Sequence, residues 1–337
     1  MKLVSYLKEG NEQLAICEAG LIYDTDHVHP ELPSSMNVFL NYWEDYYPAA
    51  VATSDAIKSG RISKDRAFSA ASVELLSPVP FPASYRDAYA FRQHVETARR
   101  NRGAKMLEEF DQYPVFYFGN HHGIQGAGEI KCMPDHFEQL DFELEVAILI
   151  SKMGRNIPAE EADEYIGGLM ILNDLSARKL QMEEMIFNLG PAKGKDFATT
   201  LGPWLVTTDE LTAYEIPAKE NHTGKCWNLS MKCMVNGVQV SAGNLSDMQW
   251  TFAELIERCS YGATLYPGDI IGSGTVGTGC FLELNGTGKA NDPGYQEQWL
   301  QEGDHIILEV EGLGQLENTI IRDEEAFSIL QRKKNLG

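Results

Sequence analysis

Apolar and polar residues alternate over residues 3–7 and 13–17, on either side of a turn at residues 9–11. Alternation sends successive side chains to opposite faces of a strand, so this segment predicts a β-hairpin. A second hairpin is predicted at residues 231–240, because Asn236-Gly237 is typical of a type I′ turn. Further strands are predicted at four apolar segments, residues 114–118, 140–149, 165–174 and 305–310, the last followed by a polar tail.

Apolar residues at spacings of three and four predict helices over residues 36–57 and 250–261. Pro48 should interrupt the first of these helices, because proline lacks the backbone N–H that a helix interior needs. Two further helices are predicted at residues 84–100 and 176–185.

Two glycine-rich segments resemble nucleotide-binding loops only in part. Residues 272–277 match the spacing GxGxxG, but we expect residues 280–284 to form a strand, whereas a dinucleotide-binding loop leads into a helix. The loop at residues 190–200 lacks the Gly-Lys-Ser/Thr ending of a phosphate-binding loop. The sequence therefore does not support nucleotide binding.

The chain has 337 residues, a length that favours two domains. Residues 76–82 contain three prolines at alternate positions and predict an extended connector. We therefore expect a domain boundary here, with a small domain over residues 1–82 and a larger domain over residues 83–337.

The net charge of −21 arises from 49 acidic and 28 basic residues. This excess argues against nucleic acid or an anionic membrane as a partner and suits a protein that handles small molecules. Six cysteines without a CxxC pair predict free thiols in a reducing compartment. We see no apolar signal segment and no stretch near about 18 uninterrupted apolar residues, so we expect a cytoplasmic protein.

The segment Leu140–Leu149 carries two glutamates, Glu143 and Glu145, among mostly apolar residues. At positions i and i+2 of a strand, both carboxylates leave on the same face. Two buried carboxylates repel each other and lose hydration, and a divalent cation is the simplest compensation. An edge strand whose glutamates face water is the alternative, and the segment alone leaves both interpretations open.

Other candidate residues lie at the ends of predicted elements or on helix faces. Asp174 ends a predicted strand, and Arg178 and Gln181 share a face of the helix that follows. Asp87 and His94 are seven residues apart, so they should project from one face of their predicted helix. That geometry suits a carboxylate beside a cation and a base, although a solvent-facing aspartate and a core histidine fit the spacing too.

Two more residues have two interpretations each, and a third, Lys195, lies in a loop. Tyr117 is either a substrate contact or part of the core. Glu283, in a predicted apolar strand, is either a functional partner or marks an edge position. Lys195 lies in a flexible basic loop of an acidic protein and is open to a binding role.

Six sequence motifs, taken together and in order, resemble the fumarylacetoacetate hydrolase family. They are Arg86-Asp87…Arg92-Gln93-His94, Asp141-Phe-Glu143-Leu-Glu145, Leu172-Asn-Asp174-Leu-Ser-Ala-Arg178…Gln181, Gly194-Lys195-Asp-Phe-Ala-Thr199-Thr, Tyr266-Pro-Gly-Asp-Ile-Ile-Gly-Ser-Gly-Thr275 and Phe281-Leu-Glu283-Leu. The resemblance implies an α+β, β-rich fold with a mixed β-roll catalytic domain and a small, barrel-like N-terminal β domain. It also implies a homodimer.

The resemblance further implies roles for single residues. The ligands of Mg²⁺ or Ca²⁺, with Mn²⁺ as a further option, would be Asp87, Glu143, Glu145 and Asp174. His94 would be the general base, oriented by Glu283. Lys195 and Gln181 would contact the developing oxyanion. Contacts to the substrate, or to residues that hold it, would come from Tyr117, Arg178 and Thr275. No organic cofactor is implied.

The implied activity is metal-dependent hydrolysis of a C–C bond in a 1,3-diketo acid, with fumarylacetoacetate of tyrosine breakdown as the favoured substrate. Leu175 and Met185 depart from the family's hydrolase, which has aromatic residues there. Thr97 replaces the glutamate of the His-x-x-Glu pair found in several relatives, which favours a hydrolase. The alternatives are an acylpyruvate hydrolase, an oxaloacetate decarboxylase, an isomerase or hydratase, and a catalytically idle metal-binding protein.

Overall fold

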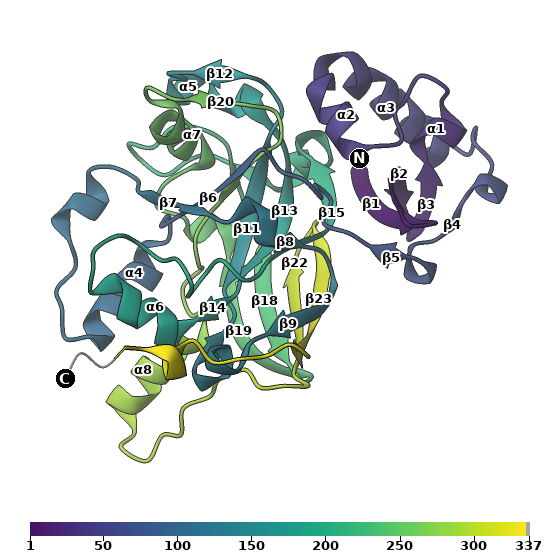
Figure 1. The fold of residues 1–337 in the computed structure, drawn as a ribbon. Coiled ribbons are helices and arrows are strands. Elements are labelled where there is room, and N and C mark those ends of the chain that lie inside the picture. Colours follow the sequence, from purple (N-terminus) through teal and green to yellow (C-terminus); the bar gives the residue numbers. More distant parts are fainter. Residues whose placement is uncertain (335–337) are drawn as a thin grey trace.

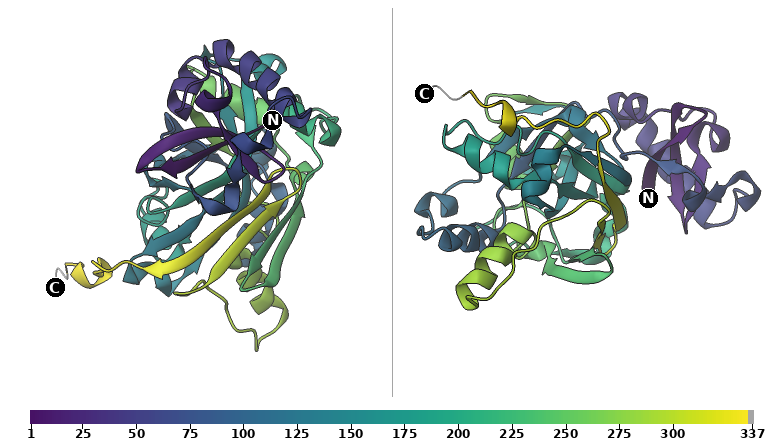
Figure 2. Two further views of the ribbon diagram at one scale, coloured as in Figure 1. Left: turned by 90° about the vertical axis from the view of Figure 1, so that its right-hand side faces the viewer. Right: turned by 60° about the horizontal axis from the view of Figure 1, so that its bottom comes forward.

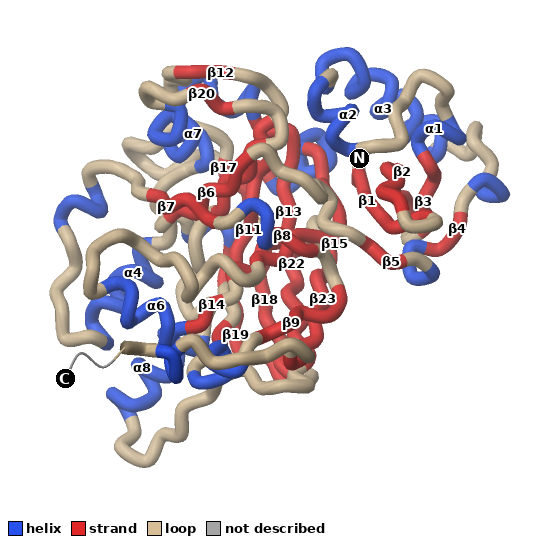
Figure 3. The backbone as a smooth tube through the Cα atoms, viewed as in Figure 1, coloured by secondary structure: helices blue, strands red, loops and turns tan. Residues whose placement is uncertain are grey.

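The computed structural model describes residues 1–334, and in this range two large β-sheets pack against each other (Figures 1 and 3). The larger sheet contains, in spatial order, β4 (Phe68–Ser69), β3 (Leu21–Asp24), β2 (Asn11–Glu18), β1 (Lys2–Lys8), β15 (Thr199–Thr207), β13 (Ile166–Asp174), β11 (Leu144–Ile150), β21 (Asp269–Gly272), β6 (Ser84–Ala88) and β7 (Phe116–Gly119), with β5 (Glu74–Leu75) beside β1 and β8 (Ile124–Gln125) beside β15. The smaller sheet contains β19 (Val238–Asn244), β18 (Ser230–Val235), β22 (His305–Val310), β23 (Gly314–Arg322) and β9 (Gly128–Cys132).

Helices cover the edges and the outer face of these sheets (Figure 1). They are α1 (Thr25–Val28), α2 (Met36–Asn41), α3 (Trp43–Lys58), α4 (Arg92–Asn101), α5 (Ala159–Ala162), α6 (Arg178–Met185), α7 (Phe252–Ser260) and α8 (Phe281–Asn291). The expected β-rich α+β fold is confirmed. Among the described residues, no helix is both long and apolar enough to cross a bilayer.

Strand β11 shows how the two sheets share a core. Its side chains at Val146 and Ile148 belong to the cluster that includes the smaller sheet, whereas Ala147 and Leu149 belong to the cluster that includes α2 and α3. Alternation along a strand explains this division, because neighbouring side chains point to opposite faces. Both faces of β11 are therefore buried, which is why the segment is almost entirely apolar.

The N-terminal residues form a β domain at one end of the molecule (Figure 2). The predicted hairpin is confirmed, because β1 pairs with β2 antiparallel along its whole length. Strand β1 also pairs with β15, with Lys2 opposite Val206. These strands thus extend the larger sheet and do not close into the barrel-like shape that the resemblance implied. A domain boundary after residue 82 stays a prediction.

The hairpin predicted at residues 231–240 is confirmed as β18 and β19. Asn236 and Gly237 have φ angles of 51° and 77°, as a type I′ turn requires at both central positions. The polar tail predicted after residue 310 is wrong, since β23 follows β22 and pairs with it antiparallel. The buried positions of β23 are Leu316, Asn318 and Ile320, so the polar Asn318 interrupts the apolar alternation.

Three predictions about helices and strands are wrong. The helix expected from residue 84 is strand β6 followed by α4, because this strand pairs with β21 on one side and β7 on the other. The strand expected at residues 280–284 begins helix α8. The break expected at Pro48 falls instead at Tyr42, and Pro48 lies inside α3. The rings of Trp43 and Tyr47, with centroids 4.9 Å apart, stack on each other at the start of that helix.

Candidate active site

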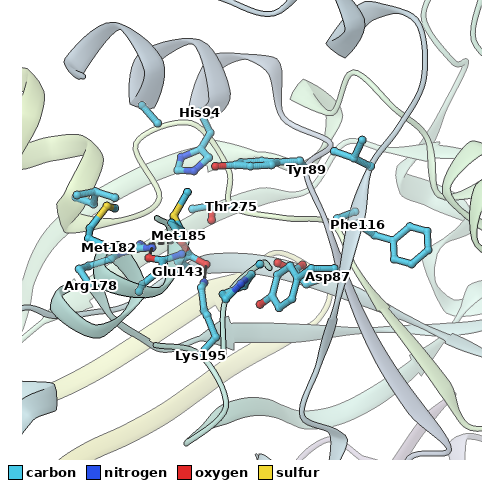
Figure 4. A pocket seen from close by; sticks show the side chains of 18 of the residues that line it. Asp87, Tyr89, His94, Phe116, Glu143, Arg178, Met182, Met185, Lys195 and Thr275 are labelled. Atoms are coloured by element: carbon cyan, nitrogen blue, oxygen red, sulfur yellow. Dashed lines mark hydrogen bonds and ion pairs between the residues drawn. The ribbon is translucent and has the colours of Figure 1, made fainter. Parts of the chain in front are cut away.

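A cavity of about 390 Å³ opens between the larger sheet, α4 and α6 (Figure 4). Most of the predicted site residues line it: Asp87, His94, Tyr117, Glu143, Arg178, Gln181, Lys195 and Thr275. The remaining predicted residues, Glu145, Asp174 and Glu283, are buried and contact this lining from behind. The structure therefore brings all the predicted site residues to one place.

Strand register positions the acidic residues. Strands β13, β11, β21 and β6 are neighbours in the sheet, and their ends meet at the cavity. Leu144 of β11 lies opposite Asn173 of β13, so Glu143 and Asp174 are adjacent across the two strands. Gly272 of β21 lies opposite Asp87 of β6. Three chain segments distant in sequence thus place carboxylates at the same end of the sheet, and the fourth, β21, contributes Gly272 between them.

Asp87, Glu143 and Glu145 form a compact carboxylate cluster, in which one oxygen of each lies within 4.8 Å of the others. Asp87 accepts a hydrogen bond from the Gly274 N–H at 3.2 Å, and Glu145 accepts one from Thr275 Oγ1 at 3.1 Å. The second carboxylate oxygen of Glu145 is buried without a hydrogen-bond partner among the described residues. A buried carboxylate oxygen without a partner is costly, and this oxygen of Glu145 is therefore open to a cation.

Burial and mutual repulsion raise the pKa values of two carboxylates of this cluster. Burial and the neighbouring charge of Asp174 raise the pKa of Asp87 to about 8. Burial and the charge of Asp87 raise the pKa of Glu145 well above its ordinary value. All three carboxylates are hard oxygen donors, so the residues present fit a divalent cation such as Mg²⁺ or Ca²⁺. The edge-strand alternative for Glu145 is wrong, because β11 lies inside the sheet and Glu145 is fully buried.

Lys195 occupies the space between Glu143 and Asp174. Its ammonium group donates to Glu143 Oε2 and, at 2.7 Å, to Asp174 Oδ2. Tyr117 also donates to Asp174, and Thr199 Oγ1 does so at 3.2 Å. Burial opposes the charge of Lys195, but Asp174 and Glu143 outweigh it and raise the lysine pKa. Asp174, predicted as a metal ligand, is thus held by Lys195 and lies outside the three-carboxylate cluster.

A buried pair is formed by His94, which lines the cavity, and Glu283 behind it. Nδ1 of His94 lies 2.8 Å from Oε2 of Glu283, and both side chains are almost fully buried. His94 is on α4 and Glu283 on α8, and these two helices pack together. The expectation that Asp87 and His94 share a helix face is wrong, because Asp87 is on β6. The turn between β6 and α4 nevertheless brings both side chains to the cavity.

Arg178 forms a second buried pair with Asp141, a residue to which the sequence analysis gave no role. Arg178 contacts Asp141 Oδ2 at 2.8 Å and Glu143 Oε1 at 2.7 Å. Asp141 also accepts the backbone N–H groups of Phe281 and Leu282 at 2.7 and 2.9 Å. Burial alone would raise the pKa of Glu143, but Lys195 and Arg178 outweigh it and lower that pKa to about 2.

The remaining cavity wall contains residues that sequence analysis missed or noted only as departures. Tyr89 is two residues beyond Asp87, and its ring centroid lies 5.7 Å from that of His94. Tyr89 lies at i+2 from the candidate ligand Asp87. In a strand these two side chains point to the same face, so a strand prediction here would have indicated Tyr89 as a site residue. Arg102 follows α4 and also lines the cavity. Met182 and Met185 form an apolar part of the wall near Arg178 (Figure 4).

Comparisons with known proteins place this geometry in context. Residues 83–321 match the family model described as fumarylacetoacetate (FAA) hydrolase, C-terminal. A fumarylacetoacetase from rice is 34% identical over 200 residues, which are 51% of this chain but only 46% of that protein. An oxaloacetate tautomerase, YisK, from Bacillus subtilis is 30% identical over 256 residues, 75% of each chain.

A solved structure adds to this likeness. The fumarylacetoacetate hydrolase from Exiguobacterium antarcticum superposes with a TM-score of 0.68 at 25% identity, over 96% of this chain and all of that one. The proteins that resemble this chain therefore share the fold and differ in the activities that their names record.

Proposed function

This chain belongs to the fumarylacetoacetate hydrolase family, and we propose that it hydrolyses a C–C bond of a 1,3-diketo acid, with fumarylacetoacetate as the favoured substrate. One observation carries the proposal. The cavity holds a histidine backed by a buried carboxylate on one side and a carboxylate cluster beside a lysine on the other (Figure 4). These are the groups that water activation and carbanion stabilisation require.

Asp87, Glu143 and Glu145 would hold the divalent cation, with Asp174 nearby. When bound, Mg²⁺ or Ca²⁺ would supply Lewis-acid polarisation of a substrate carbonyl. Glu145 supports this role because one of its buried oxygens has no hydrogen-bond partner among residues 1–334.

His94 would act as the general base. Because Glu283 occupies Nδ1, the nitrogen left for the substrate side is Nε2. Nε2 would take a proton from water, and the resulting hydroxide oxygen would bond to the carbonyl carbon of the diketo acid. Glu283 would keep the proton on Nδ1 and stabilise the imidazolium that forms.

The C–C bond would then break, and its electron pair would remain on the leaving fragment as an enolate. Lys195 and Gln181 are placed to donate hydrogen bonds to the negative oxygens that develop. His94 would return its proton to the leaving carbon, which completes acetoacetate when the substrate is fumarylacetoacetate. Arg178, Tyr117 and Thr275 would contact the substrate or hold the residues that do.

A second candidate is tautomerisation or decarboxylation of oxaloacetate. The Bacillus tautomerase, which resembles three quarters of this chain, favours this candidate. The apolar cavity wall of Met182 and Met185 also favours it, because this wall offers no hydroxyl group to bind a longer diketo acid. Tautomerisation would need only proton transfer by His94 and no attacking water.

One assay separates these candidates. The loss of the diketone's ultraviolet absorbance would be followed with Mg²⁺, with EDTA and in His94→Ala. The proposal expects turnover with Mg²⁺ only, and a rate reduced about 10²–10⁴-fold in His94→Ala. Cleavage that persists in EDTA would contradict it. Turnover of oxaloacetate alone would favour the second candidate, and no turnover of either acid with cation still bound would favour an idle binding protein.

We further propose that the protein is a cytoplasmic homodimer. Six cysteines without a disulfide support a reducing compartment. Size-exclusion chromatography with light scattering would test the dimer.

A further inference from the structure

A second group of metal-binding donors overlaps the carboxylate cluster. Ligand atoms of His94, Glu143 and Cys280 lie within 4.8 Å of one another, and all three residues are buried. Cys280 directly precedes α8, three residues before Glu283. The proposed function gives the Cys280 thiol no role.

We propose that His94, Glu143 and Cys280 form a separate site for a thiophilic cation such as Zn²⁺ or Cd²⁺. The two donor groups differ in chemistry. Asp87, Glu143 and Glu145 offer only oxygen, which suits hard cations, whereas a thiolate with an imidazole selects softer ones. Glu143 belongs to both groups, so the two sites overlap and cannot fill independently.

The surroundings of His94 suit metal binding. Metal-bound histidines commonly donate their other ring N–H to a carboxylate, which fixes the ring and strengthens the donor nitrogen. Glu283 already holds Nδ1 of His94 at 2.8 Å, so Nε2 is available. His94 and Glu143 both line the cavity, so an entering cation meets two of its three ligands at the wall.

The spacing requires only a small adjustment. Ligand atoms around tetrahedral Zn²⁺, at about 2.0–2.3 Å from the metal, are roughly 3.3–3.8 Å apart. The present group lies within 4.8 Å, so shifts of about 1 Å would close it. Glu143 would also have to release Lys195 or Arg178, which now occupy its two oxygens. On binding, the thiol of Cys280 would release its proton to solvent and the thiolate would donate a lone pair to the cation, with no change of oxidation state. A fourth position would remain open toward the cavity.

The inhibitory consequence rests on the proposed function, although the binding does not. A cation on Nε2 of His94 would remove the base, so Zn²⁺ should inhibit turnover even with Mg²⁺ in excess. Replacing Cys280 by serine keeps the shape of the side chain and removes the thiolate. Cys280→Ser should therefore retain activity with Mg²⁺ and lose most of its sensitivity to Zn²⁺.

Direct binding is measured by titrating the full chain with Cd²⁺ and following the thiolate-to-metal charge-transfer band in the ultraviolet. We expect one band-forming Cd²⁺ per chain, and at least about tenfold weaker binding with no such band in Cys280→Ser. Cys259→Ser is the matched control, because Cys259 is a buried thiol on α7 outside the cavity. It should keep the band. Glu145→Gln should also keep it, since Glu145 belongs only to the all-oxygen group.

A band that persists in Cys280→Ser, or is absent from the wild type, would overturn the proposal. Circular dichroism checks that Cys280→Ser folds, and Cys280→Ala replaces it if it does not. If the band behaves as expected but no diketo acid is turned over, the proposed function fails and the thiophilic site stands. If turnover is normal and Zn²⁺ inhibits both forms equally, the site fails and the function stands.

Discussion

His94 Nδ1 lies 2.8 Å from Oε2 of Glu283, although 189 residues separate them in the chain. Helices α4 and α8 hold the pair together, and Asn101 near the end of α4 donates to the backbone carbonyl of Glu283 at 3.1 Å. Gly286 makes room for this contact, since a Cβ there would lie 2.4 Å from the Asn101 amide nitrogen. The pair is therefore fixed by helix packing as well as by its own hydrogen bond.

Glu283→Gln should lower kcat about 10²–10⁴-fold and change KM little. The glutamine carbonyl oxygen can still accept a hydrogen bond from the Nδ1–H, but a neutral side chain cannot stabilise the imidazolium that forms during proton transfer. Steady-state kinetics on the diketo acid measure the effect. Glu254→Gln is the matched control, because Glu254 contacts His222 Nδ1 at 3.0 Å away from the cavity lining. An unchanged kcat in Glu283→Gln would exclude Glu283 as the partner of the base.

Removal of the divalent cation should make the protein less stable as pH rises. The folded pKa of Asp87 is about 8 against an ordinary 3.8, so the cation-free fold holds a proton that the unfolded chain releases. The stability from this proton is complete below about pH 4 and is lost as pH rises through about 8. Thermal unfolding in EDTA from about pH 6 to about pH 9 measures the slope.

Added Mg²⁺ should raise the melting temperature most at the alkaline end of this range, because the cation binds the ionised carboxylates. Asp87→Asn removes the titrating group and should flatten the dependence in EDTA. A cation effect that is equal at both ends of the range would contradict the assignment of Asp87 to the cluster.

Gly272→Ala should weaken cation binding at least about tenfold, because the cluster tolerates little displacement. A Cβ at Gly272 would lie 2.4 Å from Oδ1 of Asp87, so the carboxylate would have to move. Isothermal titration with Mg²⁺ measures the affinity. Gly294→Ala is the control, since a Cβ there would meet only the Asp292 side chain, at 3.3 Å. Wild-type affinity in Gly272→Ala would show that Asp87 is not needed for the cation.

Much of the site was predictable because its acidic residues lie in or next to apolar strands, where acidic residues are uncommon. Glu145 within a buried strand, Glu143 directly before it and Asp174 at the end of another are unusual enough to indicate function without a structure. The strand prediction at residues 140–149 is right for residues 144–149 because both faces of β11 are buried, but residues 140–141 form the separate strand β10. Burial on both faces gives an apolar segment that is easy to recognise.

The parts that failed depend on contacts between distant segments. Residues 84–88 were predicted as the start of a helix, but hydrogen bonds to β21 and β7 make them a strand. Helix α8 contains Gly286 and Gly288, which disfavour a helix locally. Its N-terminus is instead satisfied by Asp141, about 140 residues earlier. The sequence around residue 281 therefore cannot predict this helix cap.

Asp141→Asn should destabilise the fold by about 3–5 kcal/mol, because it breaks a buried ion pair and leaves Arg178 with one carboxylate fewer. The same carboxylate also accepts the first N–H groups of α8, so Glu283 should lose its alignment. Urea unfolding measures the stability. The double variant Asp141→Asn with Arg178→Gln should lose less than the sum of the two single variants. Strict additivity would contradict a direct coupling.

His136 should make the fold sensitive to mild acid independently of the active site. Burial, with a smaller contribution from the charge of Lys193, lowers the pKa of His136 from 6.5 to about 4. Its ring packs on Phe197 with centroids 4.0 Å apart, and its Nδ1 accepts the Met133 N–H at 3.2 Å. Between these two pKa values the unfolded chain binds a proton that the fold does not, so stability falls as pH falls.

The loss should approach about 3 kcal/mol as pH drops from about 6.5 to about 4, since each pKa unit is worth about 1.4 kcal/mol. His136→Gln keeps an acceptor for the Met133 N–H and removes the titration, so its stability should decline less over this range than that of the wild type. His305→Gln is the control, because His305 lies on the surface at 42% side-chain exposure. Carboxylates titrate in the same range in every variant, so the difference between variants is the relevant quantity. Parallel curves for wild type and His136→Gln would mean that the fold accommodates a protonated His136 without cost.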